Sequence, residues 1–249
     1  MVSQALQGVF RSLRVYHGRD APKARMDALY ARYVQPGDLV IDVGAHVGDR
    51  VSSFRRLEAR VVALEPQPLL LRALHLIHGR DRDVTILPAV AAADSGGKTL
   101  RVNSANPTVS TLSDAFVRDA AGAEGWEGQI WDTALDVPAT TLDDLIRRFG
   151  SPSFIKIDVE GFEDEVLRGL SQCVPALSFE FTTIARDVAQ RCLQALSALG
   201  PYRFDVALGE SQALQFGRGL TVTEMSQYLE HLPHAANSGD VYAVLVQDA

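Results

Sequence analysis

Cysteine is scarce in this sequence, whose 249 residues include only Cys173 and Cys192. Two cysteines are too few for the disulfide framework that holds small secreted domains together, and no histidine stands at zinc-site spacing from either of them. The two thiols are therefore expected to be free, in a reducing compartment.

Long apolar runs and an excess of basic residues are also missing. No window approaches the roughly 18 continuous apolar residues of a membrane span, and residues 1–14 contain no apolar core of signal-peptide length. Acidic residues outnumber Lys and Arg by 31 to 24, and the formal net charge is −7, whereas a general nucleic-acid binder needs a basic face. These absences predict a cytoplasmic protein with no membrane span and no nucleic-acid partner.

Short apolar segments alternate with amphipathic ones through most of the chain. Residues 1–35 are expected to form an N-terminal helical extension, and residues 36–249 one Rossmann-like domain. Strands that alternate with helices predict an α/β fold with a mostly parallel sheet. We expect seven strands, at residues 39–43, 60–64, 84–87, 154–159, 176–181, 202–206 and 241–246.

The segment 101–138 interrupts this alternation. It contains Pro107, Trp126 and Trp131 and shows little periodicity. Unstructured segments of this length inside a compact domain are usually functional or disordered, so we predict an insert that acts as a lid over the ligand site. The two tryptophans fit either stacking on a sugar or ordinary packing under the lid.

A glycine motif, Asp-Val-Gly-Ala-His-Val-Gly at residues 42–48, follows the first strand. Gly44 allows a sharp turn and a close approach of a ligand to the backbone, and Gly48 opens the next helix, whose free N–H groups face the ligand. The dinucleotide fingerprint G-x-G-x-x-G does not fit, because His46 and Asp49 stand where it needs glycines. This departure disfavours a nucleotide-dependent oxidoreductase, the alternative enzyme class on such a sheet.

An acidic residue, Glu65, ends the second strand about twenty residues after Gly44. A carboxylate at this position accepts hydrogen bonds from the two hydroxyls of a ribose. Asp42 could hold an ammonium group, and a nucleoside with an ammonium group describes S-adenosylmethionine. The alternative is that the glycines merely form a strand–helix turn and that Glu65 is solvated.

Three charged residues, Lys156, Asp158 and Glu160, follow one another at every second position of the fourth strand. Side chains alternate along a strand, so these three share one face, where charges are costly to bury unless they pair or bind something. Asp158 and Glu160 stand at the carboxyl end of the strand, where ligands bind in open α/β sheets. We predict that they are catalytic; the alternative is a structural Lys156–acid pair with Glu160 in a solvated turn.

Another acid, Glu180, interrupts the apolar fifth strand at the same end of the sheet. With Asp158 and Glu160 it could form an oxygen-ligand cage for Mg²⁺, and a bare carboxylate base is the other interpretation. The histidines show no metal-ligand pattern with nearby acids and are expected at the surface; they are His17, His75, His78, His231 and His234.

Four sequence blocks resemble the FkbM-type methyltransferases. They stand at residues 33–48, 63–66, 141–145 and 155–169, with a weaker echo at 240–243, and the resemblance runs from about Pro36 to Glu180. It implies an S-adenosylmethionine-dependent methyltransferase of class I fold with an antiparallel last strand. It also implies action mostly on hydroxyl oxygens of sugars and natural products. The chain has His46 where the family usually has Asn.

The resulting site prediction has a catalytic and a cofactor-binding part. Lys156, Asp158 and Glu160 are the catalytic candidates, and the acceptor is expected to be a small molecule or a saccharide. A catalytically inactive fold used as a binding module is a further alternative, which the intact acids disfavour. Nothing in the sequence indicates the oligomeric state. The predicted cofactor-binding residues are Asp42, Gly44, Ala45, His46, Gly48, Glu65, Pro66 and Ala89.

Overall fold

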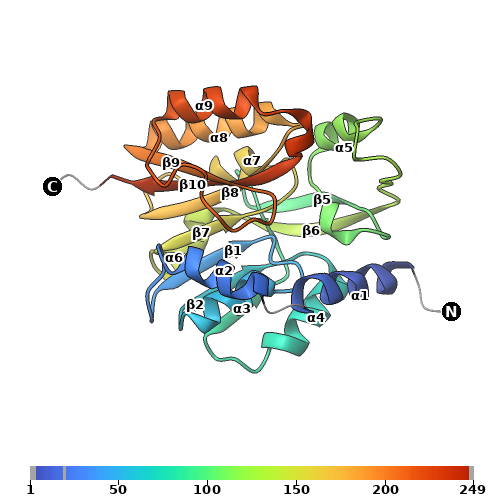
Figure 1. Ribbon diagram of the computed structural model, residues 1–249. Helices are drawn as coiled ribbons and strands as arrows, with labels where there is room; N and C mark the ends of the chain where they lie inside the picture. Colours follow the sequence, from blue (N-terminus) through green and yellow to red (C-terminus); the bar gives the residue numbers. More distant parts are fainter. Residues whose placement is uncertain (1–3, 19–20, 247–249) are drawn as a thin grey trace.

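The main sheet has seven strands in the order β3-β2-β1-β7-β8-β10-β9. A computed structural model of the chain describes residues 4–18 and 21–246 (Figure 1). All pairings in this sheet are parallel except those of β10, which runs antiparallel to β8 and β9. The predicted fold class and the antiparallel last strand are thus confirmed. The strands are β1 (Leu39–Val43), β2 (Arg60–Leu64), β3 (Val84–Leu87), β7 (Phe154–Ile157), β8 (Ala176–Thr182), β9 (Tyr202–Leu208) and β10 (Ser238–Leu245).

Helices cover both faces of this sheet, which is why all five residues of β1 are buried. Ile41 and Val43 pack with the core under α6, α7, α8 and α9, whereas Val40 packs with the core under α2, α3 and α4. The α-helices are α1 (Gln4–His17), α2 (Ala21–Tyr30), α3 (Asp49–Arg56), α4 (Pro68–His78), α5 (Asp114–Ala120), α6 (Leu142–Phe149), α7 (Glu163–Leu167), α8 (Arg186–Leu199) and α9 (Val222–His231); two 3₁₀ turns are η1 (Pro107–Val109) and η2 (His234–Ala236).

The fourth predicted strand is shorter than expected. Strand β7 ends at Ile157, and the chain then turns through Glu160 and Gly161, whose φ angles are 56° and 82°. Asp158 and Glu160 therefore lie in a turn beyond the carboxyl end of β7 and not within the strand. Both acids lie at the predicted end of the sheet, but their backbone forms a turn and not the predicted extended strand.

The structure also contains a second, three-stranded sheet that was not predicted from the sequence. Strands β4 (Val90–Ala91), β5 (Gly96–Val102) and β6 (Thr133–Thr140) pair in the order β4-β6-β5. Both ends of the predicted insert are thus regular strands. The signal was weak because β5 begins Gly-Gly-Lys-Thr and buries only Leu100.

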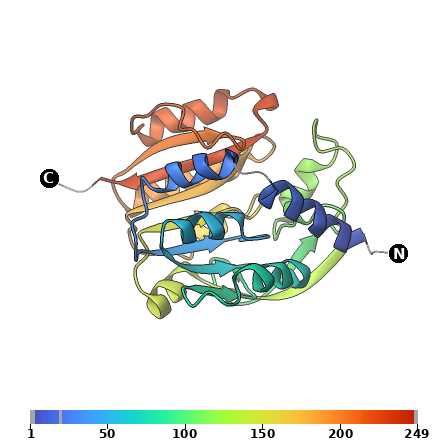
Figure 2. The ribbon, with the colours of Figure 1, turned by 60° about the horizontal axis from the view of Figure 1, so that its bottom comes forward.

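The remainder of the insert, residues 103–132, carries η1 and α5 beside the N-terminal helix α1 (Figure 2). Trp126 is 8% exposed, and its ring meets that of Phe116 edge to face in the main core. The Trp131 indole N–H donates to the carbonyl of Val109 at 2.8 Å. Both tryptophans therefore pack within the protein in this structure.

The sequence predicts five surface histidines, and for one of them, His78, this prediction is wrong. It is 7% exposed, and its Nε2 lies 3.2 Å from the Gly48 carbonyl oxygen and 3.1 Å from Ser52 Oγ. It is buried because α4 packs against the start of α3, where a Cβ at Gly48 would lie 2.6 Å from Leu74 Cδ2.

Two other sequence expectations concern thiols and membrane spans. Cys173 and Cys192 are both free, the first exposed and the second buried. Within residues 4–18 and 21–246, no helix has the length and apolar character needed to cross a membrane.

Candidate functional site

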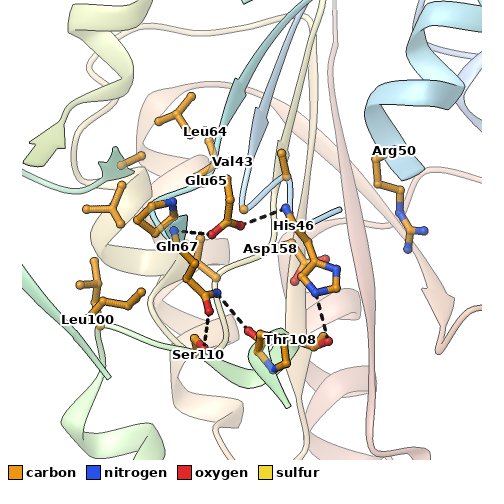
Figure 3. Close-up of a pocket in the computed structure, with 18 of the residues that line it drawn as sticks. Val43, His46, Arg50, Leu64, Glu65, Gln67, Leu100, Thr108, Ser110 and Asp158 are labelled. Carbon is orange, nitrogen blue, oxygen red and sulfur yellow. Dashed lines mark hydrogen bonds between the residues drawn. The ribbon is translucent and has the colours of Figure 1, made fainter. Parts of the chain in front are cut away.

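A cleft opens at the carboxyl ends of β1, β2 and β7 and encloses about 840 Å³ of empty space, part of it open to solvent. Figure 3 shows side chains from these strand ends meeting residues of the insert across it. Asp42, Gly48, Lys156 and Glu160 do not line it. The predicted site residues that do line it are Gly44, Ala45, His46, Glu65, Pro66, Ala89 and Asp158.

The turn after β1 is tied to both neighbouring strand ends. The N–H groups of Gly44 and Ala45 donate to the carbonyl of Leu64 at 3.1 and 2.9 Å. Gly44 has a φ of +86°, and a Cβ there would lie 1.9 Å from the carbonyl oxygen of Asp158. Only glycine fits, because the backbone is left-handed and the turn after β7 fills the space.

Glu65, the first residue after β2, is held rigidly in the wall of the cleft. It is 3% exposed, and its two carboxylate oxygens accept hydrogen bonds from the backbone N–H groups of His46 (3.1 Å) and Gln67 (2.8 Å). Burial raises the pKa of Glu65 to about 8, although these hydrogen bonds oppose the shift. Each oxygen keeps a second lone pair, so the group is placed to accept further hydrogen bonds from a ligand.

Insert residues close one side of the cleft through contacts that the sequence did not reveal. His46 Nε2 lies 3.4 Å from Thr108 Oγ1, and burial lowers the pKa of His46, which keeps the ring neutral. The Gln67 amide donates to the Pro107 carbonyl at 3.1 Å and accepts from the Ser110 hydroxyl at 3.3 Å (Figure 3). The stretch Pro107–Ser110 is therefore fastened across the cleft.

Asp42 lies behind the cleft and not in its lining. It is 1% exposed, and its Oδ2 has no hydrogen-bond partner among the described residues. Burial raises the pKa of this carboxyl to about 7. A ligand in the cleft would reach Asp42 only if the turn after β1 moved.

Lys156 is fully buried beneath the site. Its Nζ donates to Asp158 Oδ2 and to Asp240 Oδ1, each at 2.9 Å. Burial alone would raise the pKa of Asp158, but the Lys156 ammonium, together with Arg50 and a hydrogen bond with Glu180, lowers that pKa below its usual range. Asp158 thus presents an ionised carboxylate to the cleft, with its side chain 33% exposed, whereas Lys156 does not reach the cleft.

The predicted acidic trio does come together. Single carboxylate oxygens of Asp158, Glu160 and Glu180 all lie within 4.8 Å of one another. Burial and the neighbouring Asp158 charge raise the pKa of Glu160 well above its usual range. The Thr111 hydroxyl donates to the Glu160 carbonyl at 2.7 Å and so supports the left-handed turn.

The charges that line the cleft are mainly negative. Arg50, on α3, is the one Lys or Arg among the described lining residues, and it pairs with Asp49 at 2.6 Å and with Glu210 at 2.9 Å. Glu65 and Asp158 add further carboxyl groups. The cleft therefore suits a cationic ligand better than one that carries a pyrophosphate.

The cleft lies at the carboxyl ends of the parallel strands, and the seven-stranded sheet has one antiparallel strand. This arrangement defines a class I methyltransferase fold. Comparison with known proteins gives the family, because the Methyltransferase FkbM domain matches residues 42–212. The chain belongs to the FkbM methyltransferase family and is an S-adenosylmethionine-dependent methyltransferase.

One curated relative and two solved structures illustrate the similarity. The 31-O-demethyl-FK506 methyltransferase FkbM of Streptomyces tacrolimicus is 30% identical over 224 residues, which are 79% of this chain and 78% of that protein. The precorrin-6y C5,15-methyltransferase of Geobacter metallireducens GS-15 is 12% identical, with a TM-score of 0.47 over 89% of this chain and 87% of the other. A TehB-like methyltransferase of Corynebacterium glutamicum is 9% identical, with a TM-score of 0.46 over 95% and 94%.

Proposed function

We propose that this protein transfers the methyl group of S-adenosylmethionine to a hydroxyl oxygen of a sugar or natural-product acceptor. The observation that carries the proposal is the ionised Asp158 carboxylate, which is held by a buried lysine and exposed in the cleft. The name of the Streptomyces tacrolimicus relative describes methylation at an oxygen, which supports the same reaction type here.

The residues of the cleft fit the methyl donor. Glu65 offers fixed carboxylate oxygens at the end of β2, where a ribose would bind, and Gly44 leaves the backbone bare beside it. The acidic lining complements a sulfonium cation and would repel the pyrophosphate of a nicotinamide cofactor. When bound, S-adenosylmethionine supplies a methyl group on a positively charged sulfur. The protein therefore needs only to align the acceptor and remove its proton.

Asp158 is the base in this proposal. Its carboxylate would take the hydroxyl proton as the acceptor oxygen forms its bond to the methyl carbon and the methyl–sulfur bond breaks, with S-adenosylhomocysteine as the leaving group. Lys156 is a positioning residue that keeps Asp158 ionised and correctly oriented.

Binding of S-adenosylhomocysteine tests the cofactor assignment. We expect it to raise the melting temperature, whereas NADPH should leave it unchanged. Glu65→Ala removes the carboxyl group that would accept from the ribose hydroxyls and should weaken S-adenosylhomocysteine binding by about 1–3 kcal/mol, or roughly 5- to 150-fold, as measured by calorimetry. Glu230→Ala, at an exposed position on α9, is the control and should bind normally. Equal affinity of the Glu65 variant and the wild type would place the cofactor elsewhere.

The insert is proposed to be the lid over the acceptor. The contacts of Pro107–Ser110 with Gln67 and His46 fasten it to cofactor-side residues. We expect S-adenosylhomocysteine to slow limited proteolysis within residues 103–132. Cleavage there at the same rate with and without the ligand would contradict a lid.

A further inference from the structure

Three carboxylates converge where β7 and β8 end at the cleft. Asp158 and Glu160 belong to the turn after β7, and Glu180 lies near the end of β8. Oxygens of all three lie within 4.8 Å of one another. Asp158 is the one member that also lines the cleft, so the cluster borders the acceptor side of the site.

Two members of this cluster, Glu160 and Glu180, have fewer hydrogen-bond partners than buried acids normally have. Glu160 is 7% exposed, yet its carboxylate has no hydrogen bond or ion pair with any residue in 4–18 or 21–246. Glu180 Oε2 is buried and also has no hydrogen-bond partner within these ranges. The Glu180 carboxyl does share a side-chain hydrogen bond with Asp158, but the Glu160 carboxylate and Glu180 Oε2 are left without a donor in the same small volume, which is costly.

Lys156 and Arg50 are paired with other carboxylates and do not neutralise Glu160 or Glu180. The Lys156 ammonium is already shared between Asp158 and Asp240. Arg50 is engaged by Asp49 and Glu210. A neighbouring acid, Glu163, shows the contrast, because it accepts hydrogen bonds from the N–H groups of Val159 (3.1 Å) and Gly161 (3.3 Å).

We propose that Asp158, Glu160 and Glu180 bind one divalent cation that holds the acceptor hydroxyl. The binding of the cation follows from the cluster itself, and its role toward the acceptor rests on the proposed function. Carboxylate oxygens alone favour hard ions such as Mg²⁺, Mn²⁺ or Ca²⁺. With metal–oxygen distances of about 2.1–2.5 Å, ligand oxygens lie roughly 3–5 Å apart, which is the spacing of this cluster.

The cation would also complete the acceptor side of the cleft. Three protein ligands leave roughly three positions of an octahedral ion for water or for oxygens of the acceptor. An acceptor with two adjacent hydroxyl groups, such as a sugar diol, could fill two of them. The site then selects the acceptor by its oxygens and orients one of them toward the methyl donor.

Titration with Mn²⁺, followed by its electron paramagnetic resonance signal, tests the site directly. We expect the wild type to remove one Mn²⁺ per chain from solution and Mg²⁺ to displace it. Glu160→Gln and Glu180→Gln each delete one ligand charge at nearly constant volume. Each should weaken binding at least about tenfold, the loss seen even for residues that only support a metal ligand. Glu165→Gln, at a half-buried position on the adjacent helix α7, is the matched control and should bind as the wild type does.

Several results would overturn the site. Absence of Mn²⁺ binding by the wild type would do so, and so would equal affinity of the wild type and both glutamine variants. Calorimetry with S-adenosylhomocysteine shows whether each variant is folded, and a folded Glu160→Gln suffices if Glu180→Gln fails. Normal S-adenosylhomocysteine binding without any Mn²⁺ binding would reject the cation and leave the proposed methyl transfer intact.

Discussion

Asp158→Asn is expected to reduce turnover by about 10²–10⁴-fold, the usual contribution of a positioned base. The substitution keeps the shape of the side chain and removes its charge. Cofactor binding should survive, because Glu65 and the turn after β1 do not depend on that charge. The measurement is turnover of a hydroxylated acceptor under single-turnover conditions, with S-adenosylhomocysteine affinity measured in parallel.

Asp164→Asn supplies the control for this variant. Asp164 is an acid on α7 that pairs with Arg191, is more deeply buried than Asp158 and does not line the cleft, so turnover of the Asp164→Asn variant should stay near that of the wild type. Wild-type turnover in Asp158→Asn would make Lys156–Asp158 a purely structural pair.

A chelator distinguishes a metal-dependent enzyme from one in which Asp158 works as a bare carboxylate. Loss of activity with EDTA and recovery with Mg²⁺ indicate a cation, and unchanged activity indicates a bare carboxylate.

Lys156→Met should destabilise the fold by about 3–5 kcal/mol, because it leaves Asp158 and Asp240 without their buried cation. For a chain of this size that corresponds to a fall in melting temperature of roughly 6–20 °C. Asp240→Asn in the same chain should recover part of the loss. Lys98→Met, which breaks the pair between Lys98 on β5 and Asp94 just before that strand, should cost no more than about 1 kcal/mol.

The pH dependence of turnover separates the positioning role of Lys156 from its structural role. The Lys156 ammonium lowers the pKa of Asp158, so its removal should raise that pKa. Activity that needs the ionised carboxylate would then be lost at a higher pH on the acid side of the profile. An unchanged acid limb in a folded Lys156→Met protein would show that Lys156 does not tune Asp158.

Most of the main sheet could be predicted from the sequence, because buried parallel strands are short apolar runs with their own local signature. Gly44 and Glu65 were also predictable, since each stands directly after such a run. Asp158 was found because a charge at the end of an apolar strand is costly without a partner. These signals are all local to a few residues.

The rest of the site depends on contacts between distant segments. The Glu210–Arg50 pair joins residues 160 positions apart, and the His46–Thr108 contact joins residues 62 apart. Neither side of such a contact indicates its partner in the sequence. The strand β5 was missed for a related reason: its pairing with β6 defines it, and its own residues are mostly exposed.

The lining of the cleft extends along the chain from Tyr16 on α1 to Glu210 after β9. During synthesis, therefore, nearly the whole chain must leave the ribosome before Glu210 can complete the lining of the cleft. The central strands can pair earlier, but a nascent chain that stops before Glu210 would leave Arg50 without that partner. Competence to bind the methyl donor should consequently appear late in biogenesis, after most of the protein has already folded.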